Sequence, residues 1–188
     1  MKILYISPEN TVGTLSLWKK AHEARGNECT FITLFPSHQG FDPGICLNLP
    51  LIKSSPWYTK YRQHYYKITR GMKGGYQEKE GYPPVWELNS VLEKKYFQFR
   101  DWLWSKWVET AIQKYNLKEY DIFHLEWGLE FYRDGRFVKK ISKLGKPIIC
   151  TYHGQDLRTR GVIPIIDKIS SLNLTSELDL MKKHPSMN

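Results

Sequence analysis

The amino-acid sequence predicts an α/β fold with a mostly parallel β-sheet. Short runs of β-branched and aromatic residues alternate with segments whose apolar residues recur at helical spacing. Glycines stand where left-handed caps would end two of these helices. Strands that alternate with helices in this way are typical of parallel sheets. The chain has 188 residues, about the size of one domain.

Residues 2–35 predict a strand–helix–strand unit. Residues 2–7 are the β-branched and aromatic run of a buried strand, and the turn-rich stretch 8–14 follows them. A helix is then expected from Leu15, with Gly26 as its C-cap. Residues 29–35 predict a second strand, which should be parallel to the first because a helix joins the two.

The second half of the chain repeats this pattern. Its expected elements are a strand over 121–127, a helix over 129–144 capped by Gly145, a strand over 147–152, a short helix over 163–169, a strand over 172–175 and a helix from 177 to 183. Between the halves, residues 88–115 predict a long helix that packs on the sheet. Its apolar face is expected to follow Leu88, Leu92, Tyr96, Phe99 and Leu103, which recur every three or four residues, and then Trp107, Ala111, Ile112 and Tyr115.

The composition restricts the class of protein and of partner. Lys and Arg number 28 against 19 Asp and Glu, which gives a net charge of +9 and a pI near 9.4. This balance favours nucleic acid, a phosphorylated substrate or an acidic membrane surface as the partner. No apolar run approaches the roughly 18 residues of a membrane span, and the opening residues lack a secretory signal. Three widely spaced cysteines without a C-x-x-C pattern indicate a cytoplasmic protein with reduced thiols.

A basic, aromatic insertion is expected at about residues 43–84. Residues 43–77 contain no acidic residue and six basic ones, which equal two thirds of the net charge of +9. The side chains expected at a membrane surface are Trp57, Lys60, Arg62, Lys67, Arg70 and Lys73. A solvated loop or helix with its aromatic rings folded back is the alternative.

Polar residues follow three predicted strands at their carboxyl ends, where parallel sheets bind ligands. After the first strand, Gly13 and Thr14 begin a helix whose N-terminus favours an anion. An ordinary turn without a ligand accounts for these two residues equally well. Glu126 and Trp127 suit a sugar or another polar ligand, or are a surface carboxylate beside a core indole. His124, inside the same strand, is expected to be a hydrogen-bonded core histidine.

The third stretch, T-Y-H-G-Q-D-L-R over residues 151–158, contains the most side chains that could bind a ligand or take part in catalysis. His153 directly follows an apolar strand, where it can donate a hydrogen bond, act as a base or contact a sugar hydroxyl. Asp156 and Arg158 add a carboxylate and a fixed cation to the same rim. No H-E-x-x-H-like spacing supports a metal site, so we expect no metal and no cofactor.

These motifs resemble the N-terminal domain of GT-B glycosyltransferases, in particular the retaining, nucleotide-sugar-dependent family four. The resemblance covers the K-I-L-Y-I-S strand, the Gly13-Thr14 loop, D-I-F-H-L-E-W and above all T-Y-H-G-Q-D-L-R. It implies a Rossmann-like three-layer domain spanning residues 1–188, in which His153 contacts the donor sugar region. It also implies that Gly13 and Thr14 lie near the donor phosphate or the acceptor, with Glu126, Trp127, Asp156 and Arg158 along the acceptor side.

The resemblance implies transfer of a sugar from a nucleotide sugar to a hydroxyl acceptor. In that family, most nucleotide-sugar contacts lie in a C-terminal donor-binding domain, which we expect to be absent from this chain or supplied by a partner. We therefore expect this chain alone to be inactive, and to lie in the cytoplasm or at the inner face of the membrane. The alternatives are a non-catalytic sugar- or nucleotide-binding module and, less favoured, a nucleic-acid-binding protein. The sequence does not name the sugar, the nucleotide or the acceptor.

Overall fold

A computed structural model describes residues 1–51, 60, 64, 85–86, 88, 90–184 and 187 of the chain. Six parallel strands form one sheet in the order β3-β2-β1-β4-β5-β6. They are β1 (Lys2–Ser7), β2 (Glu28–Thr33), β3 (Ile45–Cys46), β4 (Ile122–Glu126), β5 (Ile148–Tyr152) and β6 (Leu172–Thr175). The predicted α/β fold with a parallel sheet is therefore confirmed.

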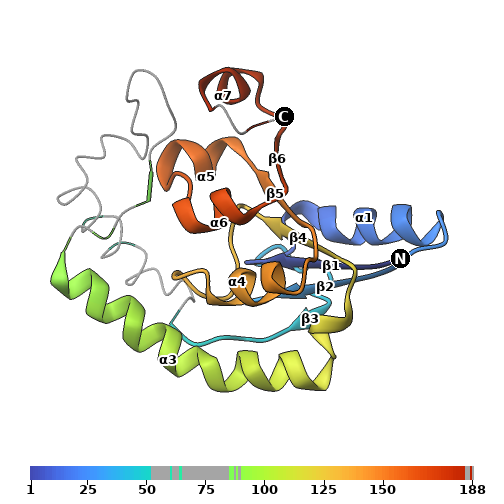
Figure 1. The fold of residues 1–188 in the computed structure, drawn as a ribbon, viewed down its shortest axis with the longest axis horizontal. Helices are drawn as coiled ribbons and strands as arrows, with labels where there is room; N and C mark the ends of the chain where they lie inside the picture. The colour runs from blue at the N-terminus through green and yellow to red at the C-terminus, as the bar shows by residue number, and fades with distance from the viewer. Residues whose placement is uncertain are drawn as a thin grey trace.

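Helices cover both faces of this sheet, which gives the three layers of a Rossmann-like fold. They are α1 (Thr14–Glu23), α3 (Val91–Lys114), α4 (Arg136–Lys143), α5 (Gly154–Thr159), α6 (Pro164–Ile169) and α7 (Leu178–Lys183), with short 3₁₀ turns at Thr11–Gly13 and Leu117–Glu119. Figure 1 shows α1 on one face of the sheet and α3 and α4 on the other. The chain builds β1, β2 and β3 outward and then returns through α3 to place β4 beside β1. The strand order therefore reverses between β1 and β4, where sheets of this kind open a ligand crevice.

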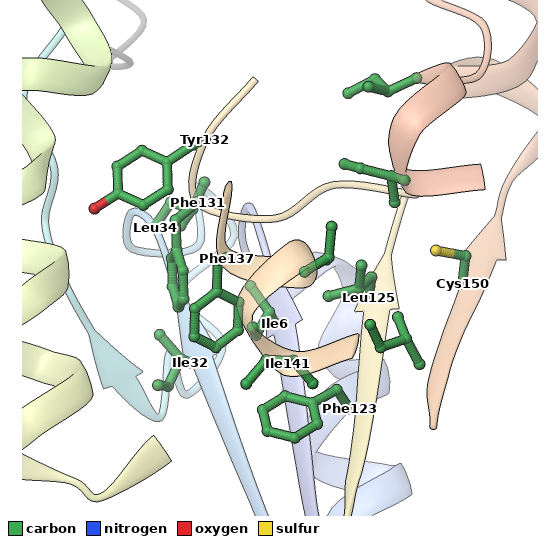
Figure 2. Packing of buried hydrophobic residues seen from close by; sticks show 14 of the residues in the cluster. Ile6, Ile32, Leu34, Phe123, Leu125, Phe131, Tyr132, Phe137, Ile141 and Cys150 are labelled. Atoms are coloured by element: carbon green, nitrogen blue, oxygen red, sulfur yellow. The ribbon is translucent and has the colours of Figure 1, made fainter. Parts of the chain in front are cut away.

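The two faces of the sheet bury separate apolar clusters because successive side chains of a strand point to opposite sides. On the α1 face, Ile3 and Tyr5 pack with Leu15 of the helix. On the other face, α4 packs onto β1 and β4. Figure 2 shows Phe137 and Ile141 of α4 beside Ile6, Phe123 and Leu125 of the strands, with Phe131 and Tyr132 next to them.

Two elements differ from the sequence prediction near the edge of the sheet. The helix expected over 129–144 begins only at Arg136, because Glu130 turns inward and its Oε1 accepts the Phe137 N–H at 3.1 Å. This carboxyl group occupies the N-terminus of α4, so the residues before Arg136 form a turn. The stretch 153–158, expected to be a loop, enters helix α5 directly after His153.

The edge strand β3 was not predicted, because two residues are too few to show a strand pattern. Ile45 and Cys46 extend the sheet beside Ile32 and Thr33, and Leu49 is buried in the core. The first residues of the expected insertion 43–84 thus belong to the folded domain. Its predicted membrane-surface residues Trp57, Arg62, Lys67, Arg70 and Lys73 lie outside the described residues, and Lys60 is exposed.

Helix α3 packs on the sheet as predicted, and Ala111 and Ile112 of the expected face are buried, but the earlier turns bury other residues than expected. Its buried apolar residues are Phe97, Trp104, Val108, Ala111 and Ile112, whereas Leu88, Leu92 and Phe99 of the expected face are exposed. The inward face accepts charge because Arg100 and Asp101 pair there. The guanidinium of Arg100 lies 4.6 Å from the Phe97 ring centroid and 4.1 Å from that of Trp104.

Candidate functional site

Glu126 and His153 form an ion pair at the carboxyl edge of the sheet. Glu126 ends β4, and His153 comes directly after the neighbouring strand β5, whose Thr151 pairs with Glu126 in register. Parallel alignment of the two strands therefore brings the side chains together. His153 Nε2 lies 2.9 Å from Glu126 Oε2, and the two side chains are 43% and 6% exposed. The carboxylate is the buried partner, and the imidazole is the more exposed one.

The Glu126 carboxylate sets the protonation of His153. Its hydrogen bond raises the pKa of the imidazole above the ordinary value, while burial opposes this shift. Protonated His153 therefore persists to a higher pH than a free histidine would. A fixed imidazolium at a sheet edge can donate a hydrogen bond to a sugar hydroxyl or a phosphate oxygen.

His124 is a neutral support for this pair. Its Nε2 lies 2.6 Å from Thr151 Oγ1 and 3.6 Å from Glu126 Oε1, and its ring stacks on Tyr5 at a centroid distance of 4.4 Å. Burial lowers the pKa of His124 to about 4, so the ring carries no charge at neutral pH. It fills the space behind Glu126 and adds no second positive charge beside His153.

Asp156 holds the start of α5 in place. Its Oδ1 accepts the His153 backbone N–H at 2.9 Å, and its Oδ2 lies 3.6 Å from Arg160 Nη2. Burial raises the pKa of Asp156 to about 6. The carboxylate is directed to the helix N-terminus and to Arg160, a positioning contact rather than an open ligand contact. Arg158 lies on the same helix, and its side chain is outside the described part of the structure.

Arg160 was missed in the sequence, although its i,i+4 spacing from Asp156 was a usable signal. It is buried and donates hydrogen bonds to the carbonyls of Trp127 and, at 3.5 Å, Gly128. Both of these residues have a positive φ, 62° and 57°. A Cβ on Gly128 would stand 2.0 Å from the Tyr152 ring, so only glycine fits there. A left-handed tryptophan after a strand is a strained conformation of the kind that clusters at functional sites.

A cavity of about 190 Å³ lies beside this loop, bounded by segments after β1, β2 and β4 and by α3. Its lining includes aromatic side chains, two arginines and a buried acid: Tyr96, Phe97, Arg100, Trp127, Glu130 and Arg133. Burial raises the pKa of Glu130 to about 8, so this carboxyl group is mostly protonated at neutral pH and can donate a hydrogen bond. The cavity combines flat apolar walls with polar groups, which suits one small polar ring rather than a large ligand.

Gly13 and Thr14 lie at the start of α1, past the end of β1 and at the same edge of the sheet. Asn10 occupies this helix N-terminus, where its Oδ1 accepts the Leu15 N–H at 3.1 Å, and Thr14 Oγ1 donates to the Thr11 carbonyl. Among the described residues, no hydrogen bond or ion pair joins Gly13 or Thr14 to Glu126 or His153. The three predicted loops thus share an edge, and among the described residues the ion pair joins only the second and third.

A second histidine–glutamate contact at this edge was not predicted. His38, which follows β2, places Nδ1 at 2.8 Å from Oε2 of Glu9, which follows β1. The described residues contain no group of three or more His, Cys, Asp or Glu side chains that could hold a metal ion. None of the described helices is long and apolar enough to cross a membrane. A scan against protein-family models and a search of curated proteins found no match for this chain.

Proposed function

We propose that this chain is the acceptor-side N-terminal domain of a GT-B glycosyltransferase of the family-four type. The observation that carries the proposal is the contact between His153 and Glu126, 2.9 Å apart at the carboxyl ends of β4 and β5. The T-Y-H-G-Q-D-L-R motif that carries the family resemblance contributes the histidine, and the D-I-F-H-L-E-W motif contributes the glutamate. Two motifs far apart in the sequence thus meet at one point.

In this proposal, His153 contacts the sugar that is transferred from a nucleotide sugar to a hydroxyl acceptor. Glu126 raises the pKa of the imidazole and fixes its orientation through Nε2 before the sugar arrives. Trp127 and the adjoining cavity provide the acceptor side, and the N-terminus of α1 lies near a phosphate or the acceptor. Stabilisation of the departing diphosphate belongs to a donor-binding domain, in this chain's partner or in a longer form of it.

Ligand-observed NMR on the chain tests this proposal. We would measure saturation transfer from the protein to UDP-glucose, UDP-N-acetylglucosamine, GDP-mannose and the matching methyl glycosides. We expect saturation of sugar-ring protons, and about tenfold weaker binding or more in His153→Ala, because hydrogen bonds to charged groups contribute roughly 1.5–3 kcal/mol. His38→Ala is the matched control, because His38 also contacts a glutamate, at 2.8 Å and at the same edge.

Three outcomes decide between the candidate functions. Sugar saturation that is lost in His153→Ala and kept in His38→Ala supports the assigned site. Saturation that is equal in both variants, or absent for every sugar, contradicts it. Sugar binding without release of nucleoside diphosphate, even with hydroxyl acceptors and a donor-binding domain added, indicates a sugar-binding module instead of an enzyme.

A further inference from the structure

Helix α3 exposes a stripe of large apolar side chains on the side away from the sheet. Leu92, Phe99 and Trp102 stand at positions i, i+7 and i+10, so they lie on one side of the helix, and Leu88 is exposed just before it. Leu92, Phe99 and Trp102 are 77%, 54% and 68% exposed. Figure 1 shows α3 as the outer element of its layer, with its length along the surface of the domain. We call Leu92, Phe99 and Trp102 the outer stripe.

The outer stripe is separate from the residues of α3 that pack in the core. The inward face of α3 already buries Phe97, Trp104, Val108 and Ile112, and it also buries the Arg100–Asp101 ion pair. The helix therefore carries large apolar side chains on its outward side in addition to those it buries, unlike an ordinary surface helix. Exposed large apolar side chains gathered on one side of a helix are typical of an interaction site.

The charges around the outer stripe indicate which kind of partner fits. The exposed charged residues of α3 are all lysines: Lys94, Lys95, Lys106 and Lys114. The acidic residues of the helix are turned away, because Glu93 and Asp101 are buried and Glu109 pairs with Lys140 at 3.1 Å. At helical spacing, Lys95 and Lys106 fall on the line of the outer stripe itself.

We infer that the outer face of α3 docks flat on an anionic lipid surface. Tryptophan, phenylalanine and leucine flanked by lysines are the side chains of helices that lie in a membrane interface. Protein–protein interfaces are instead depleted in lysine, which disfavours a protein partner for this surface. Twenty-four helical residues span about 36 Å, a long line of contact for a helix that lies in the plane of the interface.

This docking would place the cavity of the site close to the lipid. Phe97 and Arg100 line the cavity from the inward side of the same turns that carry Phe99 and Trp102 outward. A ligand in the cavity would therefore be separated from the membrane by about one helix diameter, roughly 10 Å. The inference itself does not rest on sugar chemistry, so it stands or fails independently of the proposed function.

Vesicle co-sedimentation of the chain tests the inference. We would compare vesicles of equal parts phosphatidylglycerol and phosphatidylcholine with pure phosphatidylcholine, at low and at high salt. We expect binding to the anionic vesicles that salt weakens, since lipid charges and lysines are screened. Phe99→Ser with Trp102→Ser should weaken binding by about tenfold or more, because both exposed rings lose apolar contact. Lys95→Glu with Lys106→Glu should remove the preference for anionic lipid, at about fivefold or more per residue.

Trp107→Ser is the matched control for the apolar variant. Trp107 is an exposed tryptophan of the same helix, five residues and therefore about 140° of rotation away from Trp102. We expect its binding to stay within about twofold of the wild type. Circular dichroism and thermal melting establish that each variant is folded, which these exposed positions favour.

Equal binding to anionic and neutral vesicles, or no binding to either, would overturn the inference. Wild-type binding by a folded Phe99→Ser, Trp102→Ser variant would also overturn it. A third contrary result concerns the oligomeric state. It is the absence of lipid binding together with a molecular mass in solution that rises with protein concentration in the wild type and is lower in the Phe99→Ser, Trp102→Ser variant. In that case the outer stripe is the contact between two copies of the chain.

Discussion

Glu130 offers the most direct test of the energetics of the site. This carboxyl group is 3% exposed, its Oε1 accepts the Phe137 N–H, and its Oε2 has no hydrogen-bond partner among the described residues. Burial raises the pKa of Glu130 to about 8. Glu130→Gln has the same shape and keeps the acceptor for Phe137, but it cannot ionise. The substitution therefore removes the charge and little else.

The sign of the pH dependence follows from the raised pKa. Between the unfolded pKa near 4.3 and the folded pKa of about 8, the folded state holds the proton more tightly than the unfolded state. The free energy of unfolding therefore falls as pH rises through this window, by at most about 1.4 kcal/mol per pH unit. From pH 5 to pH 8, this titration should lower the free energy of unfolding of the wild type by up to roughly 4 kcal/mol. The same loss should not occur in Glu130→Gln. Well below pH 4.3, the difference between the two proteins should no longer change with pH.

Urea unfolding from pH 5 to pH 8 measures this difference. Other groups titrate in the same range, but their contributions cancel when the free energy of unfolding of the wild type is subtracted from that of Glu130→Gln at each pH. Glu109→Gln is the control, because this half-exposed glutamate takes part in a surface ion pair worth at most about 1 kcal/mol. We expect its difference from the wild type to change little across the range.

A difference that stays flat, or that shrinks as pH rises, would refute this reasoning about Glu130. Such a result would mean that the carboxyl group is ionised in the folded protein and that a partner stabilises the charge. The neighbouring arginines of the cavity, Arg100 and Arg133, are the first groups to consider, because both line the same space. A steeper slope in the wild type than in Glu130→Gln confirms instead that a neutral acid faces the cavity at neutral pH.

Two further substitutions test the loop and the ion pair. Gly128→Ala should destabilise the fold by about 3 kcal/mol or more, because its Cβ would stand 2.0 Å from the Tyr152 ring, and a melt at neutral pH measures the loss. Gly145→Ala has the same sign of φ but nothing within 4 Å, so it should cost only about 1 kcal/mol. Glu126→Gln should lower the pKa of His153, followed by NMR titration of its ring protons. The folded protein has the raised His153 pKa, so the stability advantage of the wild type over Glu126→Gln should be complete below about pH 6.5 and disappear at higher pH. An unchanged His153 pKa in Glu126→Gln would contradict the ion pair.

The strands and the position of the candidate site were largely predictable from local patterns. The runs at residues 121–127 and 147–152 are rich in β-branched and aromatic residues, so they predict strands from local pattern alone. Because parallel strands end at one edge, Glu126 and His153 were expected there before their contact was known. Their separation of 2.9 Å follows from the direct pairing of β4 and β5, which the sequence does not state.

The buried face of α3 was not predictable from periodicity alone. This helix is apolar on several sides, so the spacing rule finds a stripe through Leu92 and Phe99 as readily as one through Phe97 and Trp104. The choice between them depends on tertiary contacts. Asp101 accepts the Arg133 backbone N–H at 3.0 Å in addition to pairing with Arg100, and this satisfies charges that a local rule would place in water.

The network behind His153 bears on whether the histidine–glutamate contact is a site or a surface ion pair. Arg160 binds the carbonyl after Glu126 and also faces Asp156, which in turn holds the His153 N–H. The Gly128 N–H donates to the Thr151 carbonyl at 3.2 Å, which links the loop after β4 to β5. Buried contacts therefore fix both ends of the pair without any ligand, and they include a left-handed tryptophan that costs of order 1–3 kcal/mol. An exposed ion pair contributes too little free energy to offset such a cost. A binding group that is held in position before its ligand arrives does need this rigidity. The arrangement therefore favours a binding role for His153.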